Sequence, residues 1–186
     1  MIWSIPNAIT LLRFLGIPWL AILIVRDRMG PALVLFVAIA LTDILDGWIA
    51  RRFHQVSEFG KLFDPFVDKL FQFVTALLLW HVGRIPLWIP GFVLVRELLM
   101  IIGGAVMLRR HHMVVFSRWY GKLAAFIQVA FFGVVFLLPE GRPDLAGWIF
   151  LLPVVLSVYA YFRYYRDNVM PVVRKERNGS QNPADP

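Results

Sequence analysis

Four aspartates stand between two long apolar runs, at positions where hydrocarbon side chains would be expected. The stretch TDILDGWIARRFHQVSEFGKLFDPFVDK, residues 42–69, contains Asp43, Asp46, Asp64 and Asp68. Short carboxylate side chains are oxygen ligands that suit hard cations such as Mg²⁺ and Mn²⁺. The chain has no cysteine, and no paired histidines support a zinc site. The stretch therefore predicts a carboxylate site for Mg²⁺ or Mn²⁺.

The spacing of the four aspartates places them on helix faces. Asp43 and Asp46 are three residues apart, and Asp64 and Asp68 are four apart, so each pair shares one face of a helix. A short loop separates the two segments, which favours antiparallel neighbouring helices. We expect the four carboxylates to meet near the cytoplasmic end of these helices.

A cluster of carboxylates in such an environment requires positive charge. One ionised aspartate at the centre of a bilayer costs about 2.5–3.5 kcal/mol on insertion scales, and neighbouring like charges add repulsion. Lys69, Arg51 and Arg52 could neutralise part of this charge. Two bound metal ions would neutralise more of it, and they could also hold a diphosphate and stabilise the oxygens of a phosphoryl transfer. We therefore expect two ions at this site.

The composition is that of a membrane protein with one domain. Hydrophobic residues make up 59% of the 186 positions and charged residues 17%. The net charge of +7 is scattered over short loops and forms no continuous stripe, which argues against nucleic acid and favours anionic lipid headgroups as partners. The first apolar run has no basic leader or evident cleavage site, so we expect it to be retained as the first span.

The apolar runs predict an all-α integral membrane bundle of six transmembrane helices. Each span needs about 20 apolar residues. Glycine and proline separate the runs, and no internal repeat is present. The predicted helices are residues 6–26, 31–52, 61–82, 86–109, 117–138 and 144–166, within one domain at 1–170. The tail at 171–186 has too little apolar content to fold alone and is predicted to be disordered.

Basic residues predict the orientation of the bundle. They concentrate in the second and fourth loops and near the C-terminus, whereas the third and fifth loops contain only Arg84 and Arg142. Arg26 and Arg28 in the first loop oppose this trend but are fewer. The N and C termini should therefore be cytoplasmic. We expect an integral protein of the bacterial cytoplasmic (inner) membrane, with its active site facing the cytoplasm.

The aspartates belong to a longer pattern that resembles a known family. The pattern is Asp43-x2-Asp46-Gly47-x2-Ala50-Arg51-x8-Gly60-x3-Asp64-x3-Asp68. It is similar at every fixed position to the signature of the CDP-alcohol phosphatidyltransferases. The resemblance extends to the opening residues, with Thr10 and Arg13, and covers nearly all of the chain except the tail.

The resemblance implies a reaction and a set of roles. An alcohol attacks the phosphatidyl phosphorus of CDP-diacylglycerol and CMP is released. Asp43, Asp46 and Asp64 would bind the metal ions, and Asp68 would be the general base and an additional metal ligand. The resemblance also implies a homodimer. The residues expected to contact or shape the cytidine diphosphate site are Gly47, Ala50, Arg51 and Gly60; the three small ones also suit close helix packing.

Two further segments bear on the acceptor alcohol. Arg96-Glu97 and the pattern Ser117-x3-Gly121-Lys122-x5-Gln128 are similar to phosphatidylglycerophosphate synthases, whose acceptor is glycerol 3-phosphate. The alternative interpretation of Arg96-Glu97 is a structural salt bridge. The chain differs from that subfamily at Ala124, where threonine is common. The cations expected to bind the acceptor phosphate are Lys122, Arg118, Arg109, Arg110 and Arg13, although most of them also fit a purely topological role.

Other functions remain open at this point. Phosphatidylglycerol is an alternative acceptor, as in the cardiolipin synthases of the same family. A transporter that uses carboxylates to carry protons or cations is the alternative outside enzymes, and it would release no CMP. Intramembrane prenyltransferases also bind diphosphates with aspartates, but their motif does not fit the Gly-x2-Ala-Arg segment.

Overall fold

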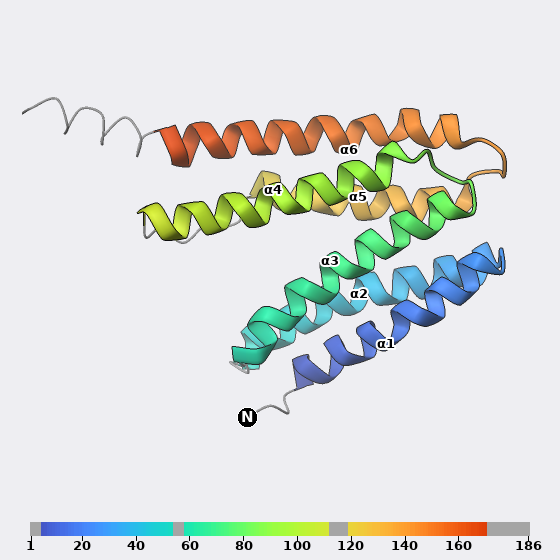
Figure 1. Cartoon of the computed structure of the whole chain (residues 1–186). Coiled ribbons are helices and arrows are strands. Elements are labelled where there is room, and N and C mark those ends of the chain that lie inside the picture. Colours follow the sequence, from blue (N-terminus) through green and yellow to red (C-terminus); the bar gives the residue numbers. More distant parts are fainter. Residues whose placement is uncertain (1–4, 54–57, 112–118, 171–186) are drawn as a thin grey trace, which may run out of the picture.

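Six α-helices make up nearly all of the described protein. The computed structural model describes residues 5–53, 58–111 and 119–170. Within these ranges it leaves the side chains of residues 5–6, 44–53, 58–62, 104–111, 120, 164, 168 and 169 undescribed. No strand occurs in the described ranges (Figure 1). The helices are α1 (Ile5–Val25), α2 (Met29–Phe53), α3 (Glu58–His81), α4 (Trp88–His111), α5 (Trp119–Leu137) and α6 (Pro143–Tyr164), followed by a π-helical turn, η1 (Tyr165–Val169). The prediction of an all-α fold is confirmed, while the predicted disordered tail lies outside the described residues.

Two helices begin two or three residues earlier than the sequence predicted. The α2 helix begins at Met29 and includes Gly30 and Pro31, because proline is tolerated in the first turn, where its missing N–H would have no helical partner. The α3 helix begins at Glu58, so Gly60 lies in its first turn. The segment between α2 and α3 is therefore only residues 54–57.

The α2 and α3 helices both pack against α1 (Figure 1). A close approach of α1 to α2 occurs at Gly16, where an added Cβ would lie 3.1 Å from Ile39. Phe36 of α2 joins two more helices, because its ring lies 5.0 Å from that of Phe71 on α3 and 5.3 Å from that of Phe136 on α5. The core thus extends from α1 through α2 and α3 to α5.

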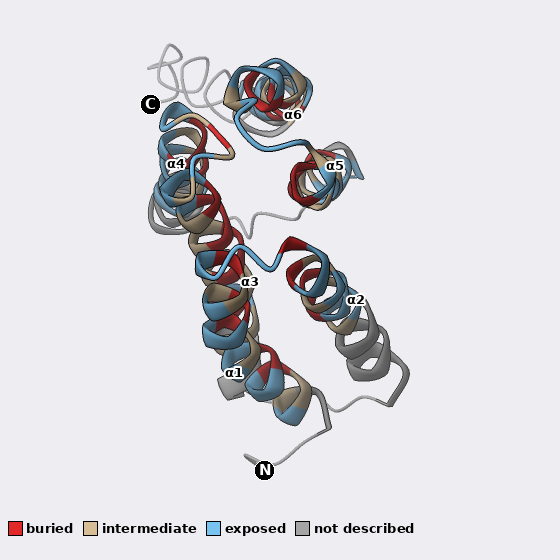
Figure 2. Cartoon of the chain, turned by 90° about the vertical axis from the view of Figure 1, so that its right-hand side faces the viewer, coloured by how far each residue is buried: buried red, intermediate tan, exposed pale blue. Residues whose placement is uncertain are grey.

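The last three helices meet at Phe150 of α6, which is fully buried. Its ring centroid lies 4.6 Å from that of Phe131 on α5, and 5.7 Å and 5.5 Å from those of Phe92 and Trp88 on α4. Figure 2 shows the buried positions on helix faces that turn toward neighbouring helices. One continuous apolar core therefore joins the two groups of helices.

The outward faces of the bundle carry many large apolar side chains. Leu12, Trp19, Val34, Phe126 and Trp148 each expose more than 60% of their surface. Within the described residues, Asn7–Val25 and Pro143–Asp167 are long and apolar enough to cross a membrane, and Met29–Asp43 and Gly121–Leu137 are shorter apolar helices. An exterior of this kind is consistent with a helical membrane bundle.

One arginine links the three loops at the end of the bundle opposite the start of α1 (Figure 1). Arg84, in the α3–α4 loop, donates to the carbonyl oxygen of Leu138 at 2.9 Å and contacts the carboxylates of Asp27 and Glu140 at 3.3 and 3.1 Å. Each loop also contains a residue with positive φ: Asp27, Gly83 or Gly141. The side chain of Arg84 is buried, whereas both carboxylates are mostly exposed. Its bond to the Leu138 carbonyl is therefore the main stabilising contact.

Replacing Arg84 should loosen this end of the bundle. Arg84→Met removes a charged hydrogen bond to a carbonyl and is expected to lower stability by about 1–3 kcal/mol. The midpoint of thermal unfolding in detergent should fall by about 5 °C. Arg142→Met, at an exposed arginine of the α5–α6 loop, should change it by less than about 1 °C. Equal effects of the two substitutions would contradict the assignment.

Candidate functional site

The α2 and α3 helices place three of the four aspartates beside α1. Asp43 lies on α2, and Asp64 and Asp68 lie one turn apart on α3. We had predicted that α2 and α3 would be direct neighbours. They do meet, at Phe36 and Phe71, but α1 packs against both and supplies polar partners to their carboxylates. The site is therefore built by three helices.

Arg13 of α1 forms an ion pair with Asp43. Arg13 Nη1 lies 2.7 Å from Asp43 Oδ1, and the arginine side chain is 1% exposed against 47% for the aspartate. A guanidinium buried in an apolar helix needs such a partner, since an unpaired charge there is costly. Arg13 thus reaches an aspartate of the site, and its expected contact with an acceptor phosphate stays a prediction.

Thr10, one turn before Arg13 on α1, forms a hydrogen bond with Asp64. Its Oγ1 donates to Asp64 Oδ1 at 2.5 Å, and the threonine is completely buried. Sequence reasoning noted Thr10 without giving it a role. The signal that would have found it is its spacing, because Thr10 and Arg13 are a polar pair three residues apart, on one face of an otherwise apolar helix.

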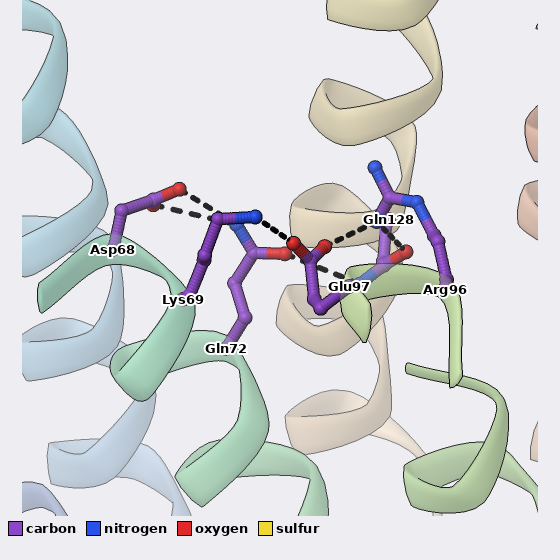
Figure 3. A network of polar contacts seen from close by, with 6 residues as sticks. All are labelled: Asp68, Lys69, Gln72, Arg96, Glu97 and Gln128. Carbon is purple, nitrogen blue, oxygen red and sulfur yellow. Dashed lines mark hydrogen bonds and ion pairs between the residues drawn. The ribbon is translucent and has the colours of Figure 1, made fainter. Parts of the chain in front are cut away.

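Asp68 lies deeper along α3 and has a different partner. Gln72 Nε2 donates to its two carboxylate oxygens at 3.3 and 3.2 Å (Figure 3). Asp68 is therefore held by a residue of its own helix, whereas Asp43 and Asp64 are held by residues of α1.

The charged pair in α4 faces α3 and α5. Glu97 pairs with Lys69 of α3 and lies 3.4 Å from Arg96, and Arg96 Nη1 also donates to Gln128 of α5 at 2.5 Å (Figure 3). These contacts confirm the interpretation of Arg96-Glu97 as a structural salt bridge. They also place Gln128, a member of the predicted acceptor pattern, beside the site.

Several predicted residues lie outside the described side chains. Lys122 is described and exposed, in the first turn of α5. Its role and those of the others stay predictions. The residues whose side chains are outside the described set are Asp46, Gly47, Ala50, Arg51, Gly60, Arg109, Arg110 and Arg118.

The donor set suits a hard divalent cation by its chemistry. Asp43, Asp64 and Asp68 offer only carboxylate oxygens, and Thr10 donates to Asp64, as partners of metal ligands commonly do. Among the described side chains, no group of three or more acidic or histidine residues is placed to hold one ion, and Asp46 is not among them. The four-carboxylate metal site stays a prediction.

Comparison with known proteins connects this geometry to a family. Residues 3–159 match the family model described as CDP-alcohol phosphatidyltransferase. This range contains α1 to α5 and most of α6, including all the site residues named above. The match covers more than half of the chain.

Curated relatives fall into two named activities. A cardiolipin synthase (CMP-forming) of Streptomyces coelicolor is 31% identical over 160 residues, which cover 83% of this chain and 72% of the relative. A CDP-diacylglycerol–glycerol-3-phosphate 3-phosphatidyltransferase of Rickettsia typhi is 32% identical over 171 residues, covering 86% and 96%. A Bacillus subtilis relative with the same name is 29% identical, covering 86% and 94%.

The hydrogen bond from Thr10 should support metal binding at Asp64. Thr10→Val keeps the side-chain shape but removes the donor, and should raise the dissociation constant for Mn²⁺ about tenfold, because such partners orient metal ligands. Thr10→Ser keeps the hydroxyl and should leave it within about twofold. Electron paramagnetic resonance of unbound Mn²⁺ measures both. Identical affinities in Thr10→Val and the unsubstituted protein would refute this role.

Proposed function

The chain belongs to the CDP-alcohol phosphatidyltransferase family, and from that premise we propose that it transfers a phosphatidyl group from CDP-diacylglycerol to glycerol 3-phosphate. The products would be CMP and phosphatidylglycerophosphate. The membership itself makes the chain an enzyme of phospholipid biosynthesis. The observation that carries the proposal is that α1 holds two of the aspartates, Asp43 through Arg13 and Asp64 through Thr10.

The proposed reaction is a displacement at phosphorus. The acceptor hydroxyl oxygen forms a bond to the phosphatidyl phosphorus, the bond from that phosphorus to the CMP oxygen breaks, and CMP leaves with the electron pair. Asp68 accepts the hydroxyl proton, since a carboxylate within hydrogen-bond reach of the nucleophile can act as general base. Divalent ions bound by Asp43, Asp46 and Asp64 would neutralise charge on the diphosphate.

Two features support glycerol 3-phosphate as the acceptor. The Rickettsia typhi and Bacillus subtilis relatives with that named activity match nearly their whole length. Lys122 is exposed in the first turn of α5, which is one turn and a half before Gln128 and its contacts to the site. An exposed ammonium there suits a phosphate that arrives from solution.

Phosphatidylglycerol is the second candidate acceptor, favoured by the Streptomyces coelicolor relative. The two candidates differ in where the acceptor comes from. Glycerol 3-phosphate enters from water and carries a phosphate monoester, whereas phosphatidylglycerol enters from the bilayer. A transporter function would need no transfer chemistry, and the family match argues against it.

The apolar exterior supports an integral membrane location. We propose six spans with both termini and the site end in the cytoplasm, and a homodimer as in the family.

The chain has no cysteine, so single introduced cysteines report position without background. Glu140→Cys should react with an impermeant maleimide from outside intact cells, and Arg166→Cys should not; the reverse pattern would invert the topology.

Catalysis should depend on Asp68 and on a divalent ion. Purified protein with CDP-diacylglycerol, glycerol 3-phosphate and Mg²⁺ or Mn²⁺ should release CMP, and chelation should stop the reaction. Asp68→Asn removes the proton acceptor and should lower the rate by at least about 100-fold. A panel of labelled acceptors identifies the alcohol. Metal-dependent cation flux without CMP release would favour the transporter instead.

Lys122 should affect acceptor binding more than chemistry. Lys122→Gln removes a cation from the phosphate and is expected to raise KM for glycerol 3-phosphate about fivefold, with little change in kcat or in KM for CDP-diacylglycerol. Lys122→Arg keeps the charge and should stay within about twofold. An unchanged KM in Lys122→Gln would remove this residue from the acceptor site.

A further inference from the structure

A continuous relay of hydrogen bonds leads from α4 through α5 to Asp68 (Figure 3). Arg96 Nη1 donates to Gln128 Oε1 at 2.5 Å, Gln128 Nε2 donates to Gln72 Oε1 at 3.1 Å, and Gln72 Nε2 donates to Asp68. Gln128 is completely buried and Gln72 is 6% exposed. Neither glutamine has an assigned role in the transfer reaction.

The two ends of the relay determine the orientation of both amides. An arginine can only donate hydrogen bonds and an ionised aspartate can only accept them. Gln72 must therefore turn its NH₂ group toward Asp68, which leaves its carbonyl for Gln128. Gln128 in turn presents its carbonyl to Arg96. Reversing either amide would set donor against donor or acceptor against acceptor, so all groups of the relay depend on one another.

The charged neighbours of Asp68 are engaged elsewhere. Lys69, its immediate neighbour in sequence, pairs with Glu97, and Glu97 also lies beside Arg96. The hydrogen bonds of Asp68 come instead from a neutral amide. An amide that reaches both carboxylate oxygens limits the rotation of the carboxylate.

We propose that Gln72 is a positioning residue that fixes the Asp68 carboxylate for proton transfer, with Gln128 and Arg96 holding Gln72 in turn. This inference rests on the proposed function. Gln72 touches neither substrate in this proposal. It acts by limiting Asp68 to one orientation, so its loss lowers the rate of the chemical step and leaves substrate binding unchanged.

The test uses the full chain in detergent, assayed for CMP release with CDP-diacylglycerol, glycerol 3-phosphate and Mn²⁺. Gln72→Met keeps the volume and removes the donor. It should lower kcat about tenfold, with both KM values within about twofold. The Mn²⁺ dissociation constant should also stay within about twofold, because the proposed function assigns the ions to Asp43, Asp46 and Asp64 and the proton to Asp68. Thr75→Val is the matched control: Thr75 is buried one turn along α3 and donates only to the Phe71 carbonyl in its own helix. It should leave kcat within about twofold.

Gln128→Met, alone and combined with Gln72→Met, tests whether the two glutamines act as one relay. Gln128→Met should lower kcat about threefold in the unsubstituted background and should cause no additional loss in Gln72→Met, because both act through Asp68. Independent, multiplicative losses would overturn the relay. So would a kcat of Gln72→Met within twofold of the original, or a loss matched by a proportional rise in the Mn²⁺ dissociation constant.

Melting temperatures of all variants show whether a loss reflects unfolding. A kcat loss that Thr75→Val reproduces at an equal fall in melting temperature would overturn the assignment. Failure of the proposed function is distinguishable, because the unsubstituted protein would then release no CMP from these substrates. If it does release CMP and Gln72→Met matches it, only the positioning role is refuted.

Discussion

A carboxylate among apolar helices must have a donor or a cation beside it, and the arrangement of this protein follows from that constraint. The α1 helix meets it for two aspartates: Arg13 pairs with Asp43 on α2, and Thr10 donates to Asp64 on α3. Losing Asp43 would leave the buried guanidinium of Arg13 unpaired, which costs more than an ordinary polar contact contributes. The α1 helix is therefore part of the site as well as part of the bundle.

The same constraint is met differently at the third aspartate. Asp68 receives hydrogen bonds from a neutral glutamine, while the nearby cations are paired with Glu97. A carboxylate that acts as general base must be oriented toward the hydroxyl group whose proton it accepts. The contrast between Asp43, held by a buried guanidinium, and Asp68, held by an amide, matches the different roles proposed for metal ligand and base.

Polar interactions are concentrated at two levels of the described bundle, with apolar packing between them. The aspartates lie toward the start of α1, and the relay leads from Asp68 through the middle of α3 and α5 to Arg96 in the first half of α4. Arg84 joins the three loops at the other end. The layer between them is made of aromatic contacts around Phe36 and Phe150. Such a tightly packed layer fixes the positions of the helices relative to one another. The polar contacts need this, because hydrogen bonds form only over a narrow range of distances.

Local patterns in the sequence determined the helices and the nature of the site. Apolar runs of about 20 residues predicted six helices, and the spacing of the aspartates predicted shared faces because a helix repeats every 3.6 residues. The pattern from Asp43 to Asp68 was specific enough to indicate the family. The tertiary structure alone decided the partners of Asp43 and Asp64 and the residue that meets Gln72. Thr10 meets Asp64 across 54 positions and Gln128 meets Gln72 across 56. Helical periodicity says which residues share a face, but the rotation and crossing of packed helices, set by the whole core, decide what that face meets.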